Sequence, residues 1–281
     1  MNLRDIILHL RIPFSFFLMP VYWFAISQTT NLDKTKAIWI FIILHLFIYP
    51  ASNAYNSYFD KDEGSIGGLE NPPAVDKKLF WVSWIIDIIA VLLAISLVDN
   101  MFGLMIFVYG LVSKAYSNDK IRLKKYPILS WIVVGVFQGA FTYFSIIMVF
   151  EKNSHDLQNH LLPAAISTLM LWAVYPMSQI YQHEEDTRRG DTTISILLGV
   201  KGTFLFTALV FSVAFWGFYI YFSPIDFMAL LIFNLPTLLF FVVWFIKTLN
   251  NVSQANFKNT MWLNLLASVC LNAFYIWLCI H

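Results

Sequence analysis

Charged side chains are scarce in this chain. Asp, Glu, Lys and Arg make up 12% of the 281 residues, whereas hydrophobic residues make up 59%. A soluble domain usually has about 25% charged residues, so this composition excludes a soluble globular protein and indicates an integral membrane protein. The net charge of +1 gives no support to a general affinity for nucleic acid, which we exclude as a partner.

Cysteines and processing signals are scarce as well. Cys270 and Cys279 both fall in the last apolar run, nine residues apart, which is too far for a disulfide within one helix. We expect both to be packing residues. No small-residue cleavage site follows the first apolar run, so we expect that run to be a retained helix. The residues before it, around Arg4 and Arg11, fit a helix lying at the membrane interface.

Long apolar runs dominate the rest of the chain. A stretch of about 20 apolar residues is long enough to cross a bilayer as a helix. We therefore predict an all-α polytopic membrane protein that forms a single domain over residues 1–281 and has about nine transmembrane helices. The expected spans are roughly 13 to 30, 37 to 55, 80 to 98, 101 to 116, 129 to 150, 161 to 182, 203 to 222, 226 to 248 and 260 to 280.

Basic residues are distributed unevenly among the connections between these runs. Lys and Arg collect on the cytoplasmic side of short loops. If the chain starts inside, all of its 18 Lys and Arg residues except Lys34, Lys36 and Lys152 fall on that side, with Lys114 counted in the loop after the fourth span. The pattern predicts a cytoplasmic N-terminus and an outer C-terminus. The cytoplasmic loops that carry motifs are expected at about 57–79, 116–128 and 183–201.

The loop after the second span opens with amides and carboxylates at helical spacing. Asn56 and Asp60 are four residues apart and share a helix face, with Asn53 one turn before them. Asp62 and Glu63 then lead into a flexible segment that contains glycine. Oxygen ligands of this kind suit a hard cation such as Mg²⁺. An acidic loop solvated at the membrane surface is equally consistent with them.

A second polar series ends the sixth span. Tyr175, Gln179, Gln182 and Asp186 fall at positions i, i+4, i+7 and i+11, which predicts one polar face on a continuous helix. Polar residues that deep in a span usually have a function; the alternative is that the amides only hold helices together. Two acidic helix ends suggest a divalent cation held between them. The carboxylates that follow this series include Glu185 and Asp191.

A basic loop follows the fourth span. It contains Tyr116, Lys120, Arg122 and Lys124. Lys and Arg at such spacing complement a diphosphate that a metal also holds. The topology signal explains the charges equally well, but it does not explain the tyrosine.

The three motifs together resemble the UbiA superfamily of intramembrane prenyltransferases, over nearly the whole chain. The hallmarks of that family are nine helices around a central cavity, an Asn/Asp-rich motif after helix 2, a Tyr-x-x-x-Lys motif after helix 4 and a second Asp-rich motif after helix 6. Three matches in this order are specific. They are Asn56-x-x-x-Asp60, Tyr116-x-x-x-Lys120 and Asp186-x-x-x-Gly190-x-x-Thr193.

The chain departs from the family pattern at two carboxylates. Members commonly carry one Asp four residues after the position of Asp60 and another four residues before that of Asp186, where this chain has Gly64 and Gln182. Either the neighbouring acids compensate or the site holds fewer metal ions. The departures make an unusual substrate, or loss of activity, more plausible for this chain than for a typical member.

The resemblance implies a Mg²⁺-dependent transfer of a polyprenyl group from an isoprenoid diphosphate to a small acceptor, an aromatic or quinone precursor, in the bacterial cytoplasmic membrane. The site would face the cytoplasm. The implied metal ligands are Asn56, Asp60, Asp62, Glu185 and Asp186. The implied substrate contacts are Asn53, Asn56, Arg122, Lys124, Gln138, Tyr175, Gln179 and Gln182, with Tyr143 facing the cavity. The implied catalytic residues are Asp60, Tyr116, Lys120, Asp186 and Asp191.

Two other classes of protein stay open. A carrier or lipid-binding protein that kept the fold and lost the chemistry would also have polar residues in its spans, but no pair of broken helices or inverted repeat is visible in the sequence. A phospholipid-headgroup transferase would carry an Asp-rich pattern that this chain lacks. Metal-dependent release of pyrophosphate would distinguish a transferase from a carrier.

Overall fold

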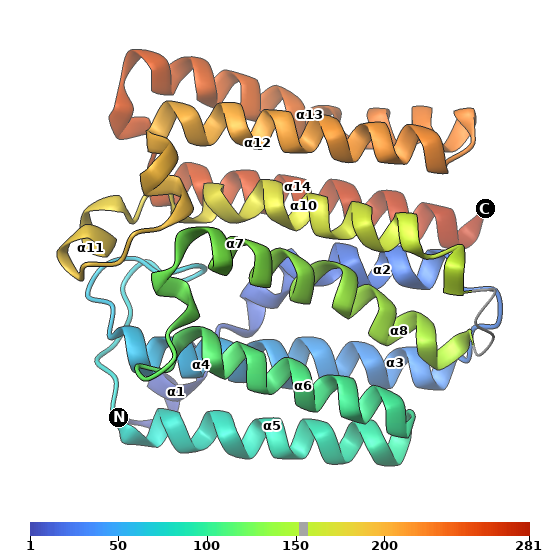
Figure 1. Cartoon of the computed structure of the whole chain (residues 1–281), viewed down its shortest axis with the longest axis horizontal. Coiled ribbons are helices and arrows are strands. Elements are labelled where there is room, and N and C mark those ends of the chain that lie inside the picture. Colours follow the sequence, from blue (N-terminus) through green and yellow to red (C-terminus); the bar gives the residue numbers. More distant parts are fainter. Residues whose placement is uncertain (152–156) are drawn as a thin grey trace. The chain divides into compact units, whose positions relative to one another are not determined.

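The structure of the chain, a computed structural model, describes residues 1–151 and 157–281 and is helical across them (Figure 1). Within these residues the β-structure is limited to an isolated bridge between Ile66 and Leu69. Lys152, assigned above to the outer side, lies outside the described residues. Two compact units can be distinguished. The first comprises Met1–Phe16, Gln28–Lys124 and Ser145–Leu157, and the second Phe17–Ser27, Lys125–Phe144 and Gln158–His281.

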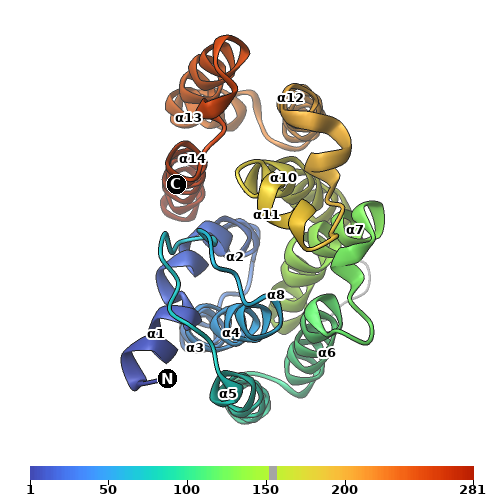
Figure 2. The ribbon, with the colours of Figure 1, turned by 90° about the vertical axis from the view of Figure 1, so that its left-hand side faces the viewer.

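In the first unit, three long helices pack side by side. The helix α4 packs on α5, and α5 and α4 both pack on α6, as Figure 2 shows. The short helix α1 packs on α4. The elements of this unit are α1 (Leu3–Leu10), α3 (Lys34–Ile42), a π-helical turn η2 (Ile43–Ile48), α4 (Tyr49–Asp60), α5 (Lys77–Leu97), α6 (Asn100–Ser117) and the 3₁₀ turn η3 (Leu123–Lys125).

Aspartates begin three of these helices. Each of these side chains accepts a hydrogen bond from the backbone N–H groups in the first turn of its helix. Asp33 does so at α3, Asp76 at α5 and Asp99 at α6. These backbone donors have no partner inside the helix, and a capping carboxylate also interacts favourably with the positive end of the helix dipole. These three acids outside the motifs therefore define where apolar helices start.

The second unit is built around α10. This helix packs on α12 and α7, α13 packs on α14, and α14 packs on α2. The elements are α2 (Met19–Ser27), α7 (Pro127–Val136), a π-helical turn η4 (Phe137–Phe141), α10 (Leu161–Gln179), α11 (His183–Arg188), α12 (Ile194–Tyr221), α13 (Pro224–Asn250), the 3₁₀ turn η5 (Val252–Gln254) and α14 (Phe257–Ile280). Two further elements divide between the units, the 3₁₀ turn η1 (Ile12–Leu18) and α8 (Thr142–Phe150).

The contact between α7 and α10 depends on one glycine and one proline. A side chain at Gly135 would come within 1.9 Å of the Trp172 ring, so only glycine allows the two helices to approach this closely. Pro176 lacks the N–H that would bond the Trp172 carbonyl oxygen. Trp131 Nε1 donates to that oxygen instead, at 2.9 Å, and the Trp131 and Trp172 rings stack with centroids 4.6 Å apart.

Eight helical stretches in the described part of the chain are long and apolar enough to cross a membrane. They confirm the predicted all-α polytopic class. The expected fourth span, 101–116, forms α6 but is not one of the eight, because polar residues such as Asn100 and Lys114 lower its hydropathy. A ninth crossing and the orientation of the chain stay predictions.

Candidate functional site

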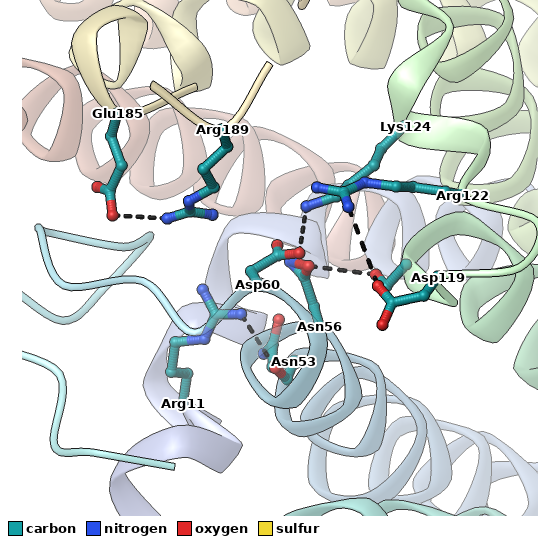
Figure 3. A network of polar contacts seen from close by, with 10 residues as sticks. Arg11, Asn53, Asn56, Asp60, Asp119, Arg122, Lys124, Glu185 and Arg189 are labelled. Carbon is teal, nitrogen blue, oxygen red and sulfur yellow. Dashed lines mark hydrogen bonds and ion pairs between the residues drawn. The ribbon is translucent and has the colours of Figure 1, made fainter. Parts of the chain in front are cut away.

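The first acidic motif lies at the end of α4, where a lysine reaches it (Figure 3). Asp60 is the last residue of α4, and Lys61 ends the helix in a left-handed conformation, φ 50°, with its N–H on the Ser57 carbonyl oxygen. The carbonyl end of a helix is negative, so a carboxylate there is unfavourable without a cation. Lys124 supplies one through an ion pair with Asp60, in which 11% of the lysine and 9% of the aspartate side chain are exposed.

Asn56, one turn earlier on α4, contacts the end of α6. Its Oδ1 accepts a hydrogen bond from Ser117 Oγ at 3.1 Å. On the same helix, Tyr55 OH accepts one from Asn118 Nδ2 at 3.0 Å. These two bonds fix α6 against α4, so the first unit brings the first motif and the start of the basic loop together.

Asn53 holds the helix α1 in place. Its Nδ2 donates to the Leu10 carbonyl oxygen at 3.3 Å, and its own carbonyl oxygen accepts from Arg11 Nη2 at 3.3 Å. Arg11 Nη1 donates in turn to the Gly67 carbonyl oxygen at 3.1 Å, in the loop after the motif. The Asn53 side chain therefore ties α4 to α1, and its contact with substrate stays a prediction.

The basic loop after α6 is tightly wound. Asn118 Oδ1 accepts a hydrogen bond from the Lys120 N–H at 3.0 Å, and the Arg122 N–H donates to the Asn118 carbonyl oxygen at 2.7 Å. Arg122 Nη1 lies 3.9 Å from Asp119 Oδ1. The Lys120 side chain is exposed. The lysine that reaches the first motif is thus Lys124, four residues beyond the lysine of the Tyr-x-x-x-Lys pattern.

The second acidic motif does not continue α10. That helix ends at Gln179, and the separate helix α11, which carries Asp186, begins directly after Gln182. The predicted continuous polar face beginning at Tyr175 is therefore wrong. Pro176 removes a backbone donor from the last turns of α10, and the acidic first turn of α11 favours a new helix N-terminus there.

Two bonds hold the motif loop in shape. Arg189 Nη2 donates to Glu185 Oε1 at 2.5 Å. The Asp186 carbonyl oxygen accepts a hydrogen bond from the Asp191 N–H at 2.9 Å. Asp191 is buried, with 6% of its surface exposed. The second unit therefore offers carboxylates at the start of α11 and a further, enclosed one just after it.

A buried hydroxyl network lies behind this loop, and no sequence pattern indicated it. His183 Nε2 lies 2.7 Å from Ser195 Oγ, which lies 3.0 Å from Thr203 Oγ1. The Ser195 N–H also donates to Gln179 Oε1 at 3.4 Å. Gln179, a predicted substrate contact, therefore uses its side-chain oxygen to fix the start of α12. Burial lowers the pKa of the His183 imidazole below its usual value. The network closes the motif loop onto α10 and α12.

A buried ion pair in the first unit was missed as well. Lys114 Nζ donates to Asp87 Oδ2, and the two residues are 4% and 8% exposed. Lys114 is thus a residue inside α6, and counting it among the loop charges is wrong. An aspartate in the middle of an apolar span is itself a signal of a structural or functional site, and Asp87 carried that signal in the sequence.

The other predicted residues take less prominent places. Tyr143 is fully buried and its OH lies 2.9 Å from His160 Nδ1, so it does not face a cavity as expected. Among the predicted residues not yet placed, Asp62, Tyr116, Gln138 and Tyr175 are half-buried.

The donor atoms of both motifs fit a hard cation. Carboxylate and amide oxygens are what Mg²⁺ prefers, usually as one or two carboxylates completed by substrate phosphates and water. Within the described residues, neither unit brings three His, Cys, Asp or Glu side chains into one group that could hold a metal. The chemistry of the residues therefore suits an ion that shares its coordination with a phosphorylated substrate.

The chain has several apolar spans, and its amides, carboxylates and cations gather at helix ends. This combination defines a polytopic membrane protein with polar sites at the ends of its helices. The chain belongs to the UbiA prenyltransferase family, whose model matches residues 17–266. This match confirms the resemblance found in the sequence. No curated protein matches the chain.

Solved structures of UbiA homologues have the same fold. One from Archaeoglobus fulgidus bound to DMAPP and Mg²⁺ superimposes with a TM-score of 0.71 at 12% identity, over 98% of this chain and 99% of that one. The apo structure of one from Aeropyrum pernix K1 gives 0.70 at 16% identity, over 94% and 98%. A structure described with digeranylgeranylglyceryl phosphate synthase gives 0.63 at 15% identity, over 99% of both chains.

Proposed function

We propose that this protein transfers a polyprenyl group from an isoprenoid diphosphate to a small acceptor within the membrane, in a Mg²⁺-dependent reaction. The observation that carries the proposal is the pairing of Asp60 with Lys124 beside Asn56, because it combines a carboxylate for a metal with a cation for a phosphate. Family membership supports it. The Archaeoglobus fulgidus homologues bound to DMAPP or GPP with Mg²⁺ support it as well.

Both motifs would contribute to holding Mg²⁺. When bound, the ion neutralises charge on the diphosphate and on the departing pyrophosphate. In the structure Lys124 neutralises Asp60. We propose that Asp60 would hold the divalent cation in place of the lysine, which would leave Lys124 to contact the diphosphate. The proposed metal ligands are Asn56, Asp60, Asp62, Glu185 and Asp186.

The cations and one enclosed carboxylate would serve the chemical step. The bond between the allylic carbon and the diphosphate oxygen breaks, and its electron pair leaves with pyrophosphate, whose charge Lys124, Arg122 and Lys120 offset. The acceptor supplies the electron pair of the new bond to that carbon. Asp191, which is 6% exposed, takes the proton that the acceptor loses. Tyr116 is the remaining proposed catalytic residue, and the remaining proposed substrate contacts are Asn53, Gln138, Tyr175, Gln179 and Gln182.

We propose an aromatic or quinone precursor as the acceptor and the bacterial cytoplasmic membrane as the location. The first follows from the family resemblance. The second follows from the same resemblance. The apolar spans support an integral membrane protein, and the concentration of Lys and Arg in the loops that carry the motifs supports a site on the cytoplasmic side.

Release of pyrophosphate tests the proposal directly. Purified protein in detergent would be given Mg²⁺, a series of prenyl diphosphates and pooled aromatic acceptors, and we expect release that acceptors stimulate and EDTA abolishes. Asp60→Ala and Asp186→Ala should each lower the rate by about a hundredfold or more, because each removes a proposed ligand of the cation whose charge would stabilise the leaving group.

A matched control comes from an aspartate far along the chain from the motifs. Asp33 caps α3, and Asp33→Asn keeps a capping side chain, so its rate should equal that of the wild type. Full turnover in both motif variants would exclude the proposed metal ligands. A folded wild-type protein that releases no pyrophosphate with any donor and acceptor would indicate a carrier.

A further inference from the structure

The side chain of Asn118 links the basic loop to the helix that ends in Asp60. Asn118 directly follows α6. Its Nδ2 donates to Tyr55 OH at 3.0 Å, and its Oδ1 accepts a hydrogen bond from the Lys120 N–H at 3.0 Å. An asparagine that bonds the N–H two residues further on closes an Asx turn. The oxygen of this amide therefore shapes the loop, and its nitrogen ties the loop to α4.

The main chain of Asn118 winds the loop as well. Its carbonyl oxygen accepts from the Ile121 N–H at 3.0 Å and from the Arg122 N–H at 2.7 Å. Arg122 has a left-handed backbone, φ 44°. Residues with a side chain rarely adopt this conformation, and it persists only where the surrounding contacts enforce it. The turn at Asn118 supplies such contacts and so sets the path of the chain toward Lys124.

The loop is attached to α4 at two points that lie close together. Asn118 bonds Tyr55, and Lys124 pairs with Asp60 (Figure 3). Tyr55 and Asp60 are five residues apart on α4, which corresponds to about 7.5 Å along the helix axis. Lys124 is six residues beyond Asn118, and a chain extended over six residues spans about 20 Å. The turn at Asn118 therefore keeps the lysine within reach of the end of α4.

Substrate binding affects the two attachments differently. The proposed function gives Asp60 to a divalent cation, so the pair with Lys124 is lost in the substrate complex. The hydrogen bonds of Asn118 involve no carboxylate and persist. A lysine on a loop that stays attached contacts the diphosphate at a small entropic cost, whereas a detached loop must be ordered as the diphosphate binds.

We propose, on the basis of the function proposed above, that Asn118 is a positioning residue. Through its bond to Tyr55 it keeps Lys124 in reach of the diphosphate while Asp60 holds the cation. Tyr55 is 1% exposed, so it acts through the loop and not by contact with the substrate. The bond between the two residues thus contributes to the affinity for the diphosphate, equally before and during the chemical step.

Steady-state kinetics with Mg²⁺ and a prenyl diphosphate distinguish positioning from a general effect on the fold. Tyr55→Phe removes the hydroxyl and keeps the ring. We expect KM for the diphosphate to rise by about five- to tenfold, the equivalent of one hydrogen bond, and kcat to stay within about twofold of the wild-type value. Tyr58→Phe removes a hydroxyl from the same helix and should leave both constants unchanged. A lower kcat at an unchanged KM would contradict the proposal.

A double variant shows whether Asn118 and Tyr55 act as one unit. Asn118→Leu removes the bond to Tyr55 together with the bond to the Lys120 N–H, so KM should rise at least as far as in Tyr55→Phe. Since both substitutions remove the same bond, adding Tyr55→Phe to Asn118→Leu should raise KM no further. Effects on KM that multiply would show that the two side chains act independently, against the proposal.

Cross-linking measures the reach of the loop without any substrate. In a variant whose native cysteines are replaced by serine, Asp60→Cys and Lys124→Cys remove the ion pair and introduce two thiols, which a bis-methanethiosulfonate with a propyl spacer joins. We expect the cross-link to form about fivefold more slowly when Tyr55→Phe is added, because a detached loop lowers the effective concentration of the thiols. Adding Tyr58→Phe should not change the rate. Equal rates in all three proteins would overturn the proposal.

The cross-linking needs neither Mg²⁺ nor diphosphate, so its failure can be told apart from that of the proposed prenyl transfer. Slower cross-linking with Tyr55→Phe, in a protein that releases no pyrophosphate, would support the attachment of the loop and count against the transfer alone. Unchanged cross-linking in a protein that does release pyrophosphate would exclude the positioning role of Asn118 and leave the transfer in place.

Discussion

At the scale of single residues, the pair of Asp87 and Lys114 is held by more than its own charges. Lys114 Nζ lies 4.8 Å from the centre of the Tyr55 ring and 4.7 Å from that of Trp84, so two aromatic faces also attract it. Tyr55 immediately precedes Asn56 and accepts the hydrogen bond from Asn118. The buried cation therefore connects α4, α5 and α6 next to the first motif.

Removing either partner of this pair leaves an uncompensated charge in an apolar interior. We expect Asp87→Asn and Lys114→Met each to lower the free energy of unfolding by about 3–5 kcal/mol, whereas the double variant should differ from the wild type by about 1 kcal/mol or less. Unfolding of all four proteins in detergent, followed by denaturant titration, gives the four free energies of the cycle.

The control for this cycle is a lysine outside the core. Lys34 is exposed, so Lys34→Met should change stability by no more than about 0.5 kcal/mol. Single variants at Asp87 and Lys114 as stable as this control would show that the pair is not buried as the structure has it.

At the scale of elements, the start of α12 depends on one backbone conformation. Gly199 interrupts the helix with φ 65° and ψ 170°, a combination that residues with a side chain rarely adopt. Its carbonyl oxygen accepts a hydrogen bond from Thr203 Oγ1 at 2.8 Å, and Thr203 also contacts Ser195. The interruption thus positions the hydroxyl network that closes the second motif loop.

Two glycines of α12 predict opposite effects of the same substitution. Gly199→Ala should destabilise the protein by about 1–3 kcal/mol, and the cost is purely conformational because a methyl group there meets no atom within 4 Å. Gly202 is helical and its added Cβ would lie 3.4 Å from the Leu198 Cβ, so Gly202→Ala should stabilise by about 0.5–1 kcal/mol.

Thermal unfolding of both variants, together with hydrogen exchange of residues 183–203, measures these effects. Faster exchange in that segment should accompany Gly199→Ala alone. The same sign of change in both variants would contradict the left-handed conformation at Gly199.

At the scale of the whole molecule, the sequence predicted what depends on local patterns. Apolar runs gave the helices, and the spacing of Asn56 and Asp60 gave a shared helix face that the structure contains. Long-range contacts carried no such pattern: the lysine that reaches Asp60 was not distinguishable among the several in its loop, and the pair of Asp87 and Lys114 forms only when α5 packs on α6. The break after Gln179 was visible only as Pro176, whose effect depends on the segment that follows.

The number of membrane crossings also belongs to this scale. The 18 residues of α6 correspond to about 27 Å of helix, close to the thickness of the apolar core of a bilayer. Ser117 at its end contacts Asn56 near the end of α4, and Gly103 near its start packs on Ile95 near the end of α5. Within the first unit α6 therefore extends alongside two helices that are long and apolar enough to span, although its own hydropathy is lower.

Accessibility of single cysteines decides whether α6 crosses the membrane. In a variant whose two native cysteines are replaced by serine, Glu70→Cys and Ile121→Cys should react with an impermeant maleimide only from the cytoplasmic side, and Asn31→Cys and Asn100→Cys only from the outer side. These four positions are exposed, so a silent position would reflect its side of the membrane. Whole cells and inside-out vesicles supply the two directions of labelling. Reaction of Asn100→Cys and Ile121→Cys from the same side would mean that α6 does not cross. The chain would then have eight spans. Both termini would lie on one side of the membrane, because an even number of crossings returns the chain to the side where it began.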